Sequence, residues 1–164
     1  MSNRTLVQMA LAIAVILIAA AGAAQTVTVG SDASTGTVVV TQQAWPGSSV
    51  TKVTIAWTSD ADTTAVLATL GPLVGAIERV VTNPDDTDAP TDNYDIKLTD
   101  EDGMDLFAGL GCNCDTADSE HFVPYFGDGT LTDRPIVVAG DATLTVENAG
   151  AEKAGIIRIY LRRL

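Results

Sequence analysis

Apolar and polar side chains alternate along four segments of the chain, and this alternation constrains the fold more than any other feature. The segments are Lys52–Thr58, Tyr94–Thr99, Ala142–Glu147 and Ile157–Arg162. A period of two places successive side chains on opposite faces of a β-strand. One face of each segment is apolar and the other polar, which is typical of antiparallel sheets packed on one side. The pattern therefore predicts half-buried strands, with Trp57 on a core-facing side.

Turn-forming residues separate these segments and indicate many short strands. Gly, Pro, Asn and Asp gather at 46–47, 83–86, 102–103, 127–129, 140–141 and 148–150. Further strands are expected at 26–29, 37–41, 77–82, 121–125 and 135–138, while 65–70 and 104–110 suit either a short helical turn or a strand. We therefore predict an all-β fold, an antiparallel, jelly-roll-like β-sandwich of about eight strands.

An apolar segment precedes this body. Residues 6–24 read LVQMALAIAVILIAAAGAA, with Arg4 before them and the small residues Ala21-Gly22-Ala23 near their end. The pattern fits a cleaved secretory signal peptide. It also fits an uncleaved membrane anchor that leaves the body outside the cytoplasm, or an apolar helix buried in an assembly. The expected organisation is an apolar amino-terminal helix over 1–24 and one β-domain over 25–164, with membrane contact through residues 6–24 in the anchor alternative.

The charge balance of the chain indicates which kinds of molecule it is unsuited to bind. The chain has 21 acidic and 9 basic side chains, a formal net charge of −12 at pH 7. A protein that neutralises phosphates needs a basic surface, so we expect no nucleic-acid partner. The acidic residues concentrate in the predicted turns, where they keep a β-rich surface soluble and oppose edge-to-edge association.

One acidic turn resembles the opening of a calcium-binding loop. Asp100, Asp102 and Asp105 are spaced D-x-D-G-x-D, and calcium prefers several oxygen ligands around a sharp turn. No glutamate stands at the twelfth position of this loop, and no helices are predicted beside it. Calcium binding by these three residues is therefore one hypothesis, and a solvated acidic turn that ends a strand is the other.

The two cysteines lie one residue apart, at Cys112 and Cys114. In an extended chain their Cα atoms would be about 6–7 Å apart, near the limit for a disulfide. An intrachain disulfide is therefore a strained alternative, and an intermolecular disulfide in an assembled particle is another. A zinc site would need two further ligands, for which His121 and the acidic residues near it are candidates. The simplest interpretation is that two small residues pack in a loop.

The remaining candidate site is a basic cluster at the carboxyl end, Arg158, Arg162 and Arg163. It is either a solvated strand face or a contact to an acidic neighbouring subunit. The sequence offers no convergent set of titratable groups for catalysis. His121 is the only histidine, and no G-x-S-x-G motif is present. We therefore predict that the protein is not an enzyme.

Four stretches of the sequence resemble a family of small virion-associated or hypothetical structural proteins of tailed bacteriophages. These are Val53–Asp60 (VTIAWTSD), Pro90–Asp105 (PTDNYDIKLTDEDGMD), Gly109–Asn113 (GLGCN) and Glu147–Gly155 (ENAGAEKAG). The resemblance extends over residues 50–160 and includes no catalytic motif. It implies a non-enzymatic virion component on the head or tail surface. The apolar segment and the cysteine pair depart from the family pattern.

Two functional hypotheses result. The first is a virion structural protein that forms a homo-oligomer and contacts other virion proteins. The alternative is an exported or membrane-anchored β-sandwich module that binds a partner or a cation on its acidic loops, with the body outside the cytoplasm.

Overall fold

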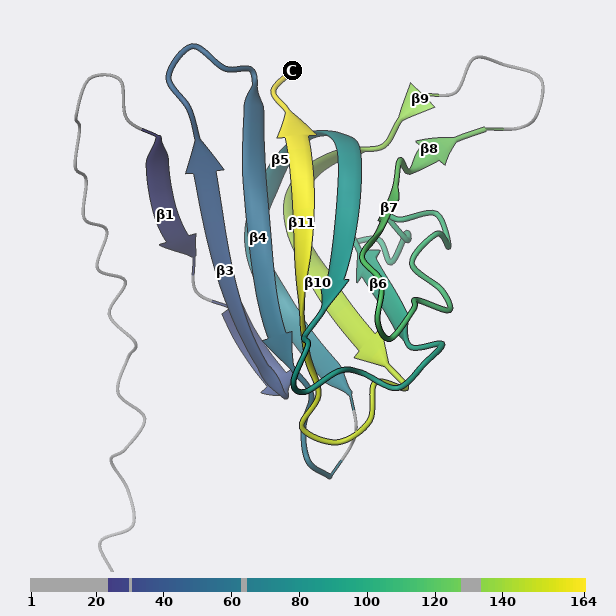
Figure 1. Ribbon diagram of the computed structural model, residues 1–164. Helices are drawn as coiled ribbons and strands as arrows, with labels where there is room; N and C mark the ends of the chain where they lie inside the picture. Colours follow the sequence, from purple (N-terminus) through teal and green to yellow (C-terminus); the bar gives the residue numbers. More distant parts are fainter. Residues whose placement is uncertain (1–23, 30, 63–64, 128–133) are drawn as a thin grey trace, which may run out of the picture.

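The computed structural model describes residues 24–29, 31–62, 65–127 and 134–164, which form strands and turns (Figure 1). The strands are β1 (Gln25–Val29), β2 (Ser31–Thr35), β3 (Thr37–Ala44), β4 (Val50–Thr58), β5 (Val66–Pro84), β6 (Asp95–Thr99), β7 (Glu120–Phe122), β8 (Tyr125–Phe126), β9 (Arg134–Pro135), β10 (Val137–Glu147) and β11 (Ala154–Arg162). Every strand pair is antiparallel, so the prediction of an all-β, antiparallel fold is confirmed.

The alternating segments of the sequence correspond to strands β4, β6, β10 and β11. Eight strands of the described chain have five residues or more, and β7, β8 and β9 are shorter. Residues 65–70 contribute the start of β5, whereas residues 104–110 form turns. The amino-terminal helix predicted over residues 1–24 lies, apart from Ala24, outside the described residues. Within the described part of the chain, no helix is long and apolar enough to cross a membrane.

One long strand connects the two halves of the sheet. The main sheet has the order β1-β3-β4-β11-β5-β10-β6, with β2 and β7 also paired to β5. The first half of β5 pairs with β2 and β10, and its second half pairs with β7 and β11. Between the two halves lies Gly75, whose φ of 144° is poorly tolerated by other residues. A Cβ atom at this position would also lie 2.8 Å from the carbonyl oxygen of Arg162. Glycine therefore allows β5 to pass from one half of the sheet to the other.

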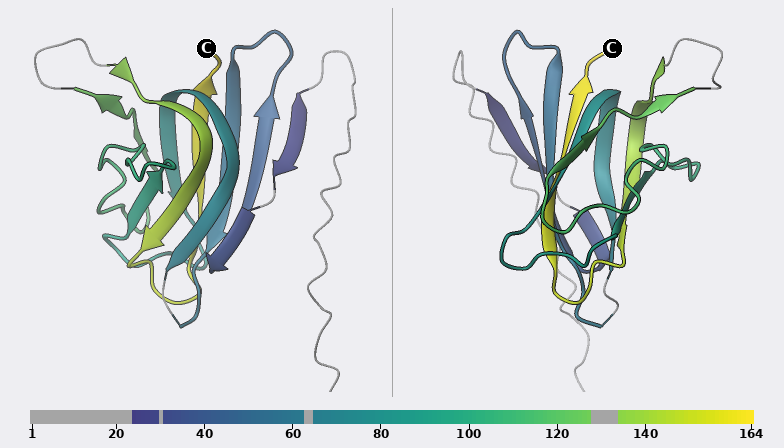
Figure 2. Two further views of the ribbon diagram at one scale, coloured as in Figure 1. Left: turned by 180° about the vertical axis from the view of Figure 1, so that it is seen from behind. Right: turned by 45° about the vertical axis from the view of Figure 1, so that its right-hand side comes forward.

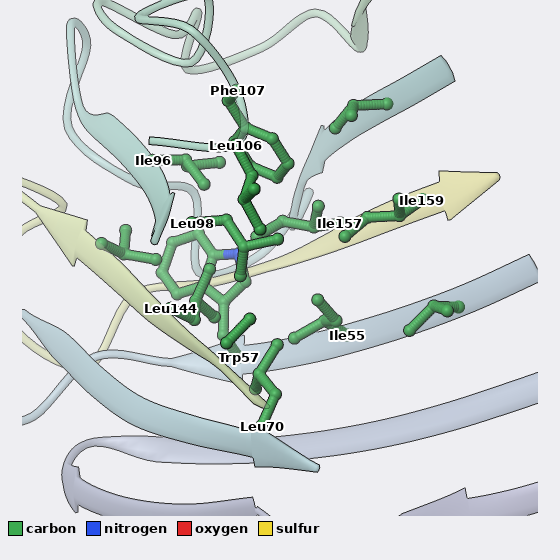
Figure 3. Packing of buried hydrophobic residues seen from close by; sticks show 14 of the residues in the cluster. Ile55, Trp57, Leu70, Ile96, Leu98, Leu106, Phe107, Leu144, Ile157 and Ile159 are labelled. Carbon is green, nitrogen blue, oxygen red and sulfur yellow. The ribbon is translucent and has the colours of Figure 1, made fainter. Parts of the chain in front are cut away.

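Because β5 bends, the two halves of the sheet lie opposite each other (Figure 2). Buried residues of β4 and β11 join those of β10 and β6 in one hydrophobic cluster. Trp57 lies inside this cluster, between Ile55, Leu70, Leu144 and Ile157 (Figure 3). Its ring also contacts the ring of Tyr94, with centroids 5.9 Å apart. The predicted core position of Trp57 is confirmed.

A loop covers the free edge of β6. The N–H of Ile96 donates to the carbonyl of Gly111, and the N–H of Leu106 donates to that of Leu98. The loop also inserts Leu106 and Phe107 into the hydrophobic cluster (Figure 3). An exposed strand edge can pair with another chain, so this cover protects one end of the sheet.

Candidate functional site

Basic side chains gather on the outer face of β4, β5 and β11. We call Lys52, Arg79, Arg158, Arg162 and Arg163 the basic patch. Four of these residues lie within the three strands, which contain a single acidic residue, Glu78. The whole chain has more than twice as many acidic as basic residues. The patch therefore carries a local charge opposite to that of the protein.

Strand register explains why residues distant in sequence meet here. Tyr160 pairs with Lys52 of β4 on one side and with Arg79 of β5 on the other. The Arg79 guanidinium lies 4.3 Å from the centre of the Tyr160 ring, and the Lys52 ammonium lies 5.7 Å from that of Trp45. Such cation–π contacts contribute about 0.5–1 kcal/mol each at exposed sites. Two cations and two aromatic rings therefore alternate across the sheet in an ordered row.

The basic patch borders a cavity at its Arg162 end. Arg162 Nε donates to Glu78 Oε1 over 2.6 Å, and both side chains are almost half exposed. Beside this ion pair is a cavity of about 360 Å³ lined by Ile77, Glu78, Val123, Pro124, Tyr125, Pro135 and Arg162. Val123 and Tyr125 are each about half exposed. An apolar, aromatic hollow bordered by charges has the composition of a protein-binding hot spot.

The opposite end of β11 is acidic. Three loops meet there: Ser59 donates to Lys153, Ala154 donates to Asp88, and Thr91 donates to Ala149, all through backbone groups. These loops carry Asp60, Asp62, Asp85, Asp86, Asp88, Asp92 and Glu152, which we call the acidic end. Lys153 is their one basic residue. The acidic end therefore lies at the start of β11, and its loops are at the bottom of Figure 1.

The structure does not bring Asp100, Asp102 and Asp105, the residues of the calcium hypothesis, together as the ligands of one site. Asp100 Oδ1 accepts the N–H groups of Asp102 and Met104, over 3.1 and 2.8 Å. Asp105 accepts those of Phe107 and Gly109. Asp102 is exposed and lines a small cavity near Gly140. Within the described ranges, no group of three or more His, Cys, Asp or Glu side chains is arranged to hold a metal. Calcium binding stays a prediction.

The two cysteines occupy different environments. Cys112 is exposed and Cys114 is buried, and both are free thiols. The intervening Asn113 has a φ of 57°, so the chain is not extended between them. Cys114 packs in the core and donates to the carbonyl of Gly111 over 3.4 Å. The packing interpretation therefore describes Cys114, and no disulfide joins the pair in this structure. An intermolecular disulfide through Cys112 stays a prediction.

The two thiols should differ sharply in reactivity. Burial, followed by the nearby carboxylate of Glu120, raises the pKa of the Cys114 thiol to about 12, and the thiolate is the reactive form. At pH 8 we expect a thiol reagent such as DTNB to label one cysteine per folded chain and two in denaturant. The variant Cys112→Ser should lose the fast label. Rapid labelling of two thiols in the native protein would contradict the buried position of Cys114.

Sequence reasoning found only part of the basic patch. Arg158, Arg162 and Arg163 are close in sequence, and the structure places the first two on β11 and the third directly after it. Lys52 and Arg79 were missed because their proximity depends on strand order and register. The alternation of Lys52 and Tyr160 with buried neighbours was the available signal for their outward orientation.

Comparison with protein-family models, curated proteins and solved structures finds no match for this chain.

Proposed function

We propose that the bent sheet is an open β-sandwich that serves as a non-enzymatic structural subunit of a bacteriophage virion. The sandwich interpretation is supported by the single core enclosed between the two halves of the sheet. A jelly-roll order has no comparable support from the strand order β1-β3-β4-β11-β5-β10-β6. Placement in a virion rests on the sequence resemblance described above.

The basic patch is the observation that carries the proposal of subunit contact. A cluster of cations on the outer face of an acidic protein is a surface suited to an acidic protein partner. Its row of Arg79, Tyr160, Lys52 and Trp45 supplies the arginine and aromatic side chains that are enriched at protein interfaces. We therefore assign the basic patch to contact with an acidic neighbour on the head or tail surface.

The test compares two double variants in phage particles purified by density gradient. Arg79→Glu/Arg158→Glu reverses the centre of the basic patch, and Lys97→Glu/Arg134→Glu makes the same change in net charge at exposed residues outside the basic patch and the acidic end. We expect the first variant to be depleted from particles at least about tenfold, since reversed charges oppose the contact. The control should be incorporated normally. Circular dichroism and thermal melts verify that both variants are folded.

Two results would contradict the proposal. The chain could be missing from purified particles that are otherwise complete. Alternatively, the folded Arg79→Glu/Arg158→Glu variant could be incorporated as well as the control, which would show that the patch makes no contact needed for assembly.

A further inference from the structure

We infer that the acidic neighbour is a second copy of this chain, whose acidic end binds the basic patch in a head-to-tail contact. This inference rests on the proposed function and identifies the partner of the same site. The contact joins two defined surfaces, the basic patch of one copy and the acidic end of the next.

The positions of the two surfaces support a head-to-tail contact. The N–H of Asp85 donates to the carbonyl of Ala154, the first residue of β11, and Arg162 is the last residue of that strand. A nine-residue strand is about 26 Å long at roughly 3.3 Å per residue. Arg162, at the far edge of the basic patch, is therefore separated from the acidic end by the length of β11. Arg162 cannot pair with the acidic end of its own copy.

The two surfaces carry net charges of opposite sign. Seven carboxylates and one lysine form the acidic end, and five cations with Glu78 form the basic patch. Backbone N–H groups of Asp88 and Thr87 donate to the Asp85 carboxylate and lower its pKa, so this group stays ionised in mildly acidic solution. The apolar lining of the cavity beside Arg162 offers a central contact that excludes water.

The chain as a whole favours a protein partner over a nucleic acid. Aromatic and basic residues also occur together where single-stranded nucleic acids bind. Here the net charge of −12 would repel a polyanion, whereas the acidic end of another copy presents its carboxylates locally. Two different surfaces of identical chains stop at a dimer only when a two-fold axis makes their contact reciprocal, and a head-to-tail contact without that axis continues into a ring or a filament. The inference therefore predicts rings or filaments.

A charge-swap experiment on the purified full chain tests the inference. The variant Asp86→Lys/Glu152→Lys reverses part of the acidic end, and Arg79→Glu/Arg158→Glu reverses part of the basic patch. Sedimentation velocity at low ionic strength should show wild-type species larger than a dimer. Each variant alone should self-associate at least about tenfold more weakly, because like charges then face each other. An equimolar mixture should recover association, since each reversed surface now meets a complementary one.

Several outcomes would overturn the inference. The equimolar mixture could stay monomeric, or Asp86→Lys/Glu152→Lys could associate as strongly as the wild type. Patch-dependent binding of a single-stranded oligonucleotide would identify a different class of partner. The inference would also be overturned if three results occurred together. The wild-type chain would be monomeric in solution, Asp86→Lys/Glu152→Lys would enter particles normally, and Arg79→Glu/Arg158→Glu would be excluded from them. That combined result would leave the proposed function intact, with another virion protein as the acidic neighbour.

Discussion

Replacing Trp57 by alanine is expected to lower the free energy of unfolding by about 3–5 kcal/mol, the usual range for removing a buried aromatic side chain. Trp57 is 2% exposed and contacts both halves of the folded sheet. Its ring also packs so closely on Gly155 that an added Cβ there would lie 2.7 Å from the indole. The resulting cavity should loosen both halves at once. Urea unfolding followed by circular dichroism measures the loss.

The second tryptophan provides a matched control. Trp45 is 39% exposed and stands outside the hydrophobic cluster, so Trp45→Ala should lower stability by less than about 1 kcal/mol. Equal losses for the two variants would show that Trp57 is not the centre of the core. Trp57→Phe, which keeps part of the ring volume, should fall between the wild type and Trp57→Ala.

Replacing Gly111 by alanine is expected to detach the loop that covers β6, with a loss of about 2–4 kcal/mol. An added Cβ would overlap the carbonyl oxygen of Ile96, a backbone atom that cannot move aside as a flexible side chain could. The same residues share a hydrogen bond of 2.7 Å, from Ile96 N–H to the Gly111 carbonyl. Hydrogen exchange should show faster exchange of the Ile96 and Leu106 amides together with the lower global stability.

Gly109 in the same loop is the control. Its φ of 76° disfavours alanine by about 1–2 kcal/mol, but no atom lies within 4 Å of the added Cβ. Gly109→Ala should therefore leave the cover of β6 in place and keep the Ile96 amide protected. If the two variants exposed the β6 edge equally, steric contact at Gly111 would not be what limits the loop.

The strands could be predicted from sequence because each alternating segment carries its own periodicity. Burial in β11, where Ile157, Ile159 and Leu161 face inward, follows the pattern directly. The long strand β5 was harder to predict, since Gly71, Pro72 and Gly75 interrupt it and the alternation of buried and exposed residues changes phase between Leu70 and Leu73. The passage of β5 from one half of the sheet to the other depends on the bend near Gly75. It also depends on the partners β10 and β11, which are far away in the chain.

The candidate site was less predictable than the fold. The arginines of β11 could be identified because they are neighbours in sequence. Tyr160, however, acquires Lys52 and Arg79 as neighbours only through the order β4-β11-β5. The acidic end likewise combines three loops whose proximity is set by backbone hydrogen bonds. Local composition predicts charge, whereas tertiary structure decides which charges share a surface.

The central claim, that the chain assembles through complementary charges, is tested most directly by sedimentation equilibrium of the unmodified protein in a salt series from about 20 to 500 mM, which shortens the Debye length severalfold. We predict an apparent mass well above the 17.0 kDa of one chain at low salt, falling towards that value as salt increases. Association driven by apolar surfaces does not weaken in this way and is strengthened by sulfate or phosphate salts. An apparent mass that is independent of salt, or that rises with it, would contradict the account.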